Sequence, residues 1–241
     1  MKFAFLIEPP FNYYTENGIV TGSDVELART ILPMVGIDQV EFIETEFAEL
    51  LPGVADGRWQ MTTGLFATDE RREVAAFSRP IWALPDGLLV SVGNPKGLSG
   101  YKSIAADRSC RLAVIRDQFQ HRSAQQFGVP EERIVVFATY NDAASAVLMG
   151  DVDAYASVGR AHTGFIEQTQ SEAFEVVTVP VAEKQPAFGS FAFHKNNDQL
   201  RLAVDHALSQ FLGTIAHRNM MASFGFSDSE IDLVASSNGQ P

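Results

Sequence analysis

The stretch Gly64–Arg72, with the sequence GLFATDERR, decides how we interpret the fold of this chain. It follows residues 59–63, which have the composition of a β-strand, and it leads toward Pro80. Thr68 precedes two acidic residues and can accept a hydrogen bond from a free backbone N–H, so the pattern predicts a helix start. Arg71 then lies early in that helix, and its planar guanidinium can pair two-on-two with a carboxylate. The stretch predicts an anion site at the mouth of a sheet, unless Arg71 only pairs with a neighbouring glutamate at the surface.

Strands and helices alternate along the chain on both sides of this stretch. We expect strands at residues 2–7, 40–45, 59–66, 112–115, 134–137, 153–157 and 174–179. We expect helices at residues 23–35, 47–54, 123–127, 142–149, 197–212 and 215–224. Ser23 or Asp24 would cap the first helix, Gly36 would end it, and Pro33 would disturb its last turn. The alternation predicts an α/β fold with a mainly parallel sheet.

The chain is expected to cross twice between two similar α/β blocks. The first crossing is predicted at residues 88–92, before a linker at Gly93–Gly97, and the second at residues 188–194. The two blocks would form one lobe from residues 1–88 plus 190–241 and a second lobe from residues 89–189. Two crossings of this kind predict a ligand cleft between the lobes.

Length, charge and cysteine content exclude several classes of protein. The 241 residues are enough for one large domain or two lobes, and 46% of them are hydrophobic. The formal net charge of −12 argues against non-specific binding of nucleic acid. No run of about 18 apolar residues occurs, so no direct insertion into a membrane is expected. The single cysteine, Cys110, cannot form an internal disulfide, which fits both the cytosol and many exported bacterial proteins.

The motifs of common enzyme classes do not occur in this sequence. There is no nucleophile elbow, P-loop or dinucleotide-binding glycine fingerprint, and the five histidines lack the spacing of metal ligands. We therefore expect no catalytic residue, no cofactor and no metal site. Residues 1–7 superficially resemble a signal peptide, but they are too short and no cleavage site follows, so we expect a mature chain without its signal peptide. Residues 236–241 are expected to be a disordered tail.

The candidate binding residues of the first block follow its strands. Glu8 and Phe11 follow the first strand, Phe47 follows the second, and Phe66 with Arg71 follows the third. Ligands of open parallel sheets bind outside the carboxyl ends of the strands, so these residues are expected to converge. Together they pair an anion receptor with an aromatic and carboxylate receptor for a cation, which suits a small zwitterion. The alternative is that each Phe is a core residue and Glu8 is solvated.

The stretch Gly64–Phe77, together with Gly22–Ala28, resembles the polar amino-acid family of solute-binding proteins that feed ABC importers. Within this family, family 3, the sequence is most similar to the ectoine/hydroxyectoine-binding branch. The branch features are Glu8–Phe11, Thr45–Phe47, Gly93–Leu98 and Val152–Ala156. The resemblance covers nearly the whole chain, in detail to about residue 168. It implies a two-lobed type II periplasmic binding protein fold with a ligand cleft between the lobes.

The resemblance also implies roles for individual residues. Arg71 would hold the ligand carboxylate, Glu8 would meet a delocalised cation, and the three Phe residues would form aromatic walls. The implied ligand-binding set is Glu8, Phe11, Phe47, Gly64, Phe66 and Arg71 in the first lobe and Asp117, Gln118, Phe119, Ser157 and Val158 in the second. Val158 stands where amino-acid binders usually place an acid for the α-ammonium, which argues against a simple α-amino acid. The loop at residues 116–119 is bulkier and more charged than the small-residue loop expected in the ectoine branch.

By this resemblance the protein is a periplasmic, non-enzymatic component of an ABC importer. It would capture a small zwitterion such as ectoine or hydroxyectoine by hinge closure and present the closed shape to a membrane permease. Two alternatives on the same fold are a polar amino-acid binder and a lyase resembling the cyclohexadienyl dehydratases, for which Glu8 would be the titratable group. A third alternative is a sensory domain of a larger receptor.

Overall fold

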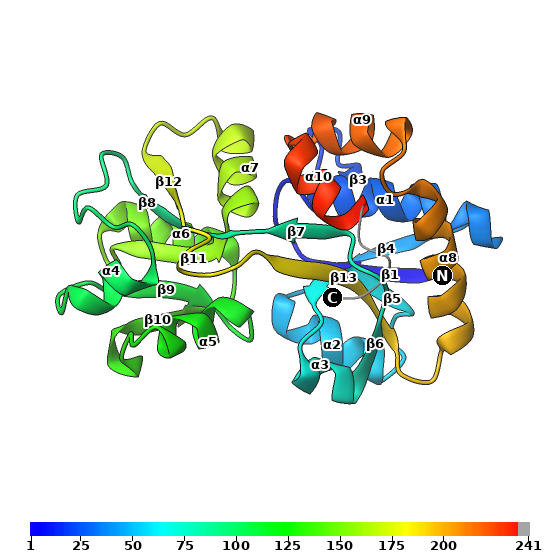
Figure 1. The fold of residues 1–241 in the computed structure, drawn as a ribbon, viewed down its shortest axis with the longest axis horizontal. Coiled ribbons are helices and arrows are strands. Elements are labelled where there is room, and N and C mark those ends of the chain that lie inside the picture. The colour runs from blue at the N-terminus through cyan, green and yellow to red at the C-terminus, as the bar shows by residue number, and fades with distance from the viewer. Residues whose placement is uncertain (236–241) are drawn as a thin grey trace. The chain divides into compact units, whose positions relative to one another are not determined.

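Two units, each with its own β-sheet, make up residues 1–235, which the computed structural model describes (Figure 1). Unit 1 combines Met1–Ala83 with the residues from Phe188 onward, and unit 2 is Leu84–Ala187. The tail expected to be disordered lies outside the described residues. The expected linker Gly93–Gly97 lies inside unit 2, because the preceding strand β8 (Asp86–Ser91) is already part of that unit's sheet. No helix within residues 1–235 is long and apolar enough to cross a membrane.

The sheet of unit 1 has the strand order β4-β1-β5-β13-β6, and β7 also pairs with β13. The bounds are β1 (Lys2–Phe5), β4 (Glu41–Glu44), β5 (Met61–Phe66), β6 (Ala75–Phe77), β7 (Trp82–Leu84) and β13 (Ala187–His194). β1 runs parallel to β4 and β5, as expected, whereas β13 runs antiparallel to β5 and β6. The segment expected as the second crossing is therefore mostly a strand of this sheet. A short hairpin of β2 (Tyr13–Tyr14) and β3 (Val20–Thr21) stands apart from it.

Helices cover both faces of this sheet. Figure 1 shows α1, α9 and α10 on one side and α2 and α3 on the other. Their bounds, with that of α8, are α1 (Ser23–Ile31), α2 (Phe47–Ala55), α3 (Asp69–Val74), α8 (Asp198–Phe211), α9 (Ile215–Ser223) and α10 (Asp228–Ala235). The predicted cap of α3 is confirmed, because the Thr68 hydroxyl accepts a hydrogen bond from the backbone N–H of Arg71.

The first helix differs from its prediction at both ends. Its N-cap is Gly22, which has no side chain, so the prediction that Ser23 or Asp24 caps it was wrong. The α-helix ends at Ile31, and a 3₁₀ turn, η1 (Pro33–Val35), follows. Pro33 has no N–H to continue the α-helical ladder, so the last turn tightens before Gly36, which has φ 80°.

The sheet of unit 2 has the strand order β10-β9-β11-β8-β12. The bounds are β9 (Leu112–Ile115), β10 (Ile134–Phe137), β11 (Ala154–Val158) and β12 (Phe174–Thr178), and the helices are α4 (Tyr101–Ala106), α5 (Phe119–Gln126), η2 (Glu131–Arg133), α6 (Tyr140–Met149) and α7 (Gly159–Thr169). β9, β10 and β11 are parallel, and β8 is antiparallel to β11 and β12. Helices α4, α7 and α10 were not expected. In α7, Gly159 and Gly164 lower the intrinsic helix propensity, and packing against the sheet compensates.

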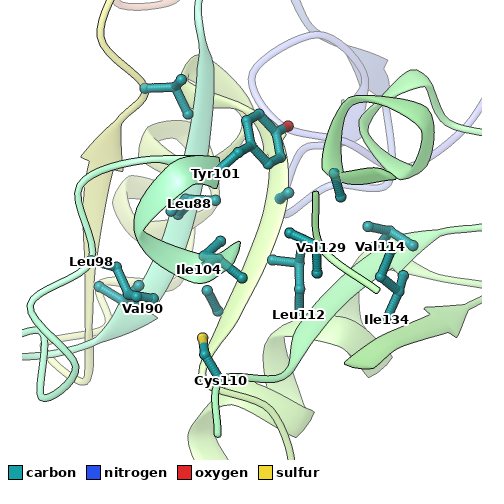
Figure 2. Packing of buried hydrophobic residues seen from close by; sticks show 14 residues of the cluster. Leu88, Val90, Leu98, Tyr101, Ile104, Cys110, Leu112, Val114, Val129 and Ile134 are labelled. Carbon is teal, nitrogen blue, oxygen red and sulfur yellow. The ribbon is translucent and has the colours of Figure 1, made fainter. Parts of the chain in front are cut away.

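The core of unit 2 forms between its central strands and α4. Leu88 and Val90 of β8 and Leu112 of β9 are fully buried in one cluster with Tyr101 and Ile104 of α4 (Figure 2). Because these apolar side chains come from alternate strand positions, they all lie on one face of the sheet, and that face packs in the core. The carboxyl ends of the strands are then held at fixed places for the site residues that follow them.

Candidate functional site

The candidate residues of unit 1 follow three neighbouring parallel strands. β1 lies between β4 and β5, with Phe5 opposite Glu44 and Ala4 opposite Thr62. All three strands therefore end at the same edge of the sheet. The residues that lie at or just beyond this edge are Glu8, Phe11, Phe47, Gly64 and Phe66.

Arg71 is oriented at this edge by contacts to two of the other candidate residues. Its Nη1 donates a hydrogen bond of 3.1 Å to the backbone carbonyl of Phe66. Its Cζ lies 5.3 Å from the centre of the Phe47 ring, within the range of a cation–π contact. These contacts hold one nitrogen and one face of a guanidinium that is only partly buried. The structure thus brings Phe47 of α2 together with Phe66 and Arg71 of the stretch Gly64–Arg72.

An aromatic cluster adjoins this edge. Phe11 and Phe66 both contact the indole of Trp82, with ring centres 5.2 and 5.7 Å away. Phe226 meets Phe11 edge-on at 6.1 Å. Phe11 is only 2% exposed and Phe66 is 9% exposed, so both rings are largely packed, whereas Phe47 is half-buried. Trp82 and Phe226 were not among the expected site residues.

Asp24 links this cluster to the end of β5. It is fully buried, and its Oδ2 accepts hydrogen bonds from the Thr63 hydroxyl at 2.6 Å and from the Gly64 backbone N–H at 2.8 Å. Its Oδ1 accepts one from Nε1 of Trp82 at 3.1 Å. Burial raises the pKa of Asp24 from its ordinary 3.8 to about 6, although the hydrogen bonds from Thr63, Gly64, Trp82 and Ser23 favour the ionised form.

The raised pKa of Asp24 predicts a specific pH dependence of stability. Between pH 3.8 and about 6 the folded protein keeps the Asp24 proton that the unfolded chain has released. The free energy of unfolding therefore loses about 3 kcal/mol from this group as the pH rises through that interval. Urea unfolding at a series of pH values gives the free energy of unfolding of the parent and of Asp24→Asn. The difference between these two free energies should change with pH by the contribution of Asp24. A parent–variant difference that stays constant from pH 4 to 7 would contradict it.

The comparison with Asp24→Asn is needed because other buried groups titrate at low pH. Burial lowers the pKa of His162 to about 3 and that of His217 to about 4. Below their ordinary pKa the unfolded chain binds protons that the folded protein does not, so these two groups make stability rise with pH. Their contribution has the opposite sign to that of Asp24, and it is common to the parent and the variant.

The candidate residues of unit 2 follow two neighbouring parallel strands, β9 and β11. Asp117 is exposed and has φ 64°, Gln118 is the buried N-cap of α5, and Phe119 is the first residue of that helix. Ser157 and Val158 end β11 and are 2% and 5% exposed. The structure places these five residues at the carboxyl edge of the unit 2 sheet. A non-glycine residue with positive φ is uncommon and is often found at functional sites.

A buried ion pair lies beside Phe119. Lys184 Nζ is 2.8 Å from Oδ2 of Asp86, whose side chain is fully buried, and it lies 5.3 Å from the centre of the Phe119 ring. Asp86 also accepts hydrogen bonds from the Tyr101 hydroxyl at 2.6 Å and from Nε2 of Gln120 at 3.1 Å. The Lys184 ammonium therefore contacts both the Asp86 carboxylate and the Phe119 ring at the start of α5.

Sequence reasoning missed Trp82, Asp86 and Lys184. One signal pointed to the first of them: Gly64 and Gly189 lie in strands, where glycine often marks the close approach of another group. Nothing local pointed to the ion pair. Within residues 1–235, no three His, Cys, Asp or Glu side chains are grouped so that they could hold a metal ion.

Comparison with known proteins identifies the family of this chain. The sequence matches the bacterial extracellular solute-binding proteins, family 3, over residues 2–217. It is 32% identical over 234 residues to a probable amino-acid ABC transporter periplasmic-binding protein of Sinorhizobium fredii, covering 94% of this chain and 77% of the relative. It is 27% identical over 237 residues to the arginine-binding protein ArgT of Corynebacterium glutamicum, covering 93% and 73%.

A solved structure agrees with this assignment. The crystal structure of EhuB in complex with hydroxyectoine superposes with a TM-score of 0.87 at 26% identity, covering 98% of this chain and 91% of EhuB. The expected type II periplasmic binding protein fold is confirmed. The extent of the family match and the identity to the Sinorhizobium relative show that this chain belongs to family 3 of the bacterial extracellular solute-binding proteins.

Proposed function

We propose that this protein captures a small zwitterion of the ectoine type outside the cytoplasm, in the periplasm, and delivers it to the membrane permease of an ABC importer. The ligand would carry a carboxylate and a cation that is delocalised in a ring or methylated. The observation that carries the proposal is the grouping of Arg71 with Phe47 and Phe66 at the carboxyl edge of the unit 1 sheet.

Arg71 is the proposed anchor of the ligand carboxylate. The Phe47 ring lies against its guanidinium, and the Phe66 carbonyl takes a hydrogen bond from Nη1. A guanidinium presents its N–H donors in a planar fork that matches the two oxygens of a carboxylate, so the proposed contact is bidentate. Because the group is oriented before the ligand arrives, less entropy is lost on binding.

Glu8, Phe11, Phe47 and Phe66 form the proposed cation site. A primary ammonium is compact and strongly hydrated and needs several acceptors to replace its water. A diffuse cation gives up its water more readily and gains about 0.5–2 kcal/mol from each ring face within reach. Glu8, which is 9% exposed, would add Coulomb attraction at the end of β1.

Unit 2 supplies the remaining contacts in this proposal. Hinge closure would bring Asp117, Gln118, Phe119, Ser157 and Val158 to the ligand, and the closed shape would be the signal for the permease. Val158 offers an apolar side chain where an α-ammonium would need an acid, which supports a ligand other than a simple α-amino acid. The likeness to EhuB, whose structure holds hydroxyectoine, supports the same class.

A polar amino acid is the second candidate ligand. The curated relatives named above are described as amino-acid and arginine binders, and their sequence identities to this chain, 32% and 27%, both exceed the 26% of EhuB. A lyase activity is the third candidate, since Glu8 would be a titratable group beside the ligand.

Calorimetric titration with ectoine, hydroxyectoine, glycine betaine, histidine, arginine and glutamine distinguishes these candidates. We expect a compatible solute to bind at least about tenfold more tightly than any of the amino acids, which is a difference of about 1.4 kcal/mol. Chromatography of the recovered ligand should show it unchanged, and a converted ligand would favour the lyase. Tight binding of an α-amino acid, with no compatible solute bound, would overturn the proposed ligand class.

A further inference from the structure

The indole of Trp82 lies over two glycines of the unit 1 sheet. A Cβ at Gly64 would stand 2.7 Å from its Nε1, and a Cβ at Gly189 would overlap its six-membered ring. Gly189 pairs with Phe66 across β13 and β5, and Gly64 is two residues from Phe66, so all three lie on the same face of the sheet. The absence of side chains at the two glycines leaves room for an indole there.

One carboxylate holds this indole and the end of β5 together. Asp24 accepts a hydrogen bond from Nε1 of Trp82 at 3.1 Å and another from the backbone N–H of Gly64 at 2.8 Å. Asp24 is fully buried, and a buried acceptor that loses its donor has no water to replace it. The indole is therefore fixed to the strand that carries Phe66.

Two of the proposed aromatic walls pack on the fixed indole. The Phe11 ring centre is 5.2 Å away with an interplanar angle of 38°, and the Phe66 ring centre is 5.7 Å away with an angle of 69°. Phe11 and Phe66 come from different segments, and Trp82 contacts both. We infer that Trp82 is a positioning residue for the cation site, which sets the placement of Phe11 and Phe66; this inference rests on the proposed function of those rings.

The consequence for binding follows from the short range of cation–π attraction. A cation gains from a ring only within about 6 Å of its centre and over its face. When the indole is replaced by a smaller ring, Phe11 and Phe66 lose their common support and their relative placement relaxes. Affinity for the ligand then falls, although the carboxylate contact at Arg71 is kept.

Trp82→Phe tests this role, and Trp59→Phe is its matched control. Trp59 is also buried in unit 1, donates its Nε1–H to the Leu50 carbonyl at 2.9 Å and lies over a glycine, Gly53. We titrate both variants with the tightest ligand of the panel above. Affinity should fall about tenfold in W82F, as expected for lost ring contacts, and change less than about twofold in W59F.

Fluorescence gives a second measurement that does not depend on how well W82F folds. The chain has two tryptophans, so W59F carries Trp82 as its single fluorophore, and W82F carries Trp59. Saturating ligand should change the emission of W59F and leave that of W82F unchanged. This readout responds to the neighbourhood of the ligand site and not to stability.

Equal losses of affinity in the two variants, or parental affinity in W82F, would overturn the inference. Unchanged emission of W59F at saturating ligand would do the same. The proposed ligand class fails separately, if the tightest ligand of the panel is an α-amino acid. The comparison of W82F with W59F then uses that amino acid and still decides the role of Trp82.

Discussion

Replacement of Arg71 by alanine is expected to weaken ligand binding by at least about a hundredfold. Each hydrogen bond to a charged group contributes about 1.5–3 kcal/mol, and a bidentate carboxylate pair has two. The ligand carboxylate would also lose its counter-charge. Calorimetry with the best ligand of the parent measures the loss directly.

Arg71→Lys separates geometry from charge. Lysine keeps the positive charge but cannot reproduce the planar fork, so affinity should still fall by at least about tenfold. The matched control is Arg72→Ala on the same helix, because Arg72 is exposed, donates to the Ala67 carbonyl and lies over the Phe77 ring. We expect the control to bind like the parent. If Arg71→Ala also binds like the parent, the assignment of the whole site is wrong.

The second large effect is expected on stability, from the ion pair of Asp86 and Lys184. Asp86→Ala would leave the ammonium of Lys184, whose side chain is 12% exposed, without its counter-charge. It would also remove the acceptor for Tyr101 and Gln120. Breaking a buried pair from one side costs about 3–5 kcal/mol, so the midpoint of urea unfolding should fall clearly.

Two further variants make this prediction specific. The double replacement Asp86→Leu with Lys184→Met removes both charges, and it should recover the part of the loss that comes from the unpaired ammonium. The part that comes from the lost acceptor of Tyr101 and Gln120 should remain. Glu49→Ala breaks the pair with Arg58, whose side chains are 50% and 43% exposed, and should cost at most about 1 kcal/mol. Equal effects of Asp86→Ala and Glu49→Ala would show that the Asp86 pair is not buried in solution.

Local patterns were sufficient for most of the parallel strands and for many of the helices, but not for α4, α7, α10 or the antiparallel strand β13. The helix start at Thr68 was predicted from a hydroxyl followed by acidic residues, and the hydrogen bond from Arg71 confirms it. The parallel pairing of β1 with β4 and β5 followed from the alternation of strands and helices. The helix α7 was missed because its glycines disfavour a helix locally, and its contacts with the sheet are made only in the folded chain.

The sequence by itself determined the alternation of strands and helices in both units, the family, and the position of Arg71 after a strand end, because each depends on residues that are close together in the chain. The tertiary structure decided which groups support the candidate site. Asp24 and Trp82 are 58 positions apart in the sequence. Asp86 and Lys184 are near the first and the last residue of the segment that forms unit 2. A buried carboxylate is stable only with donors or a counter-charge beside it, and the folded chain alone determines which distant segments supply them.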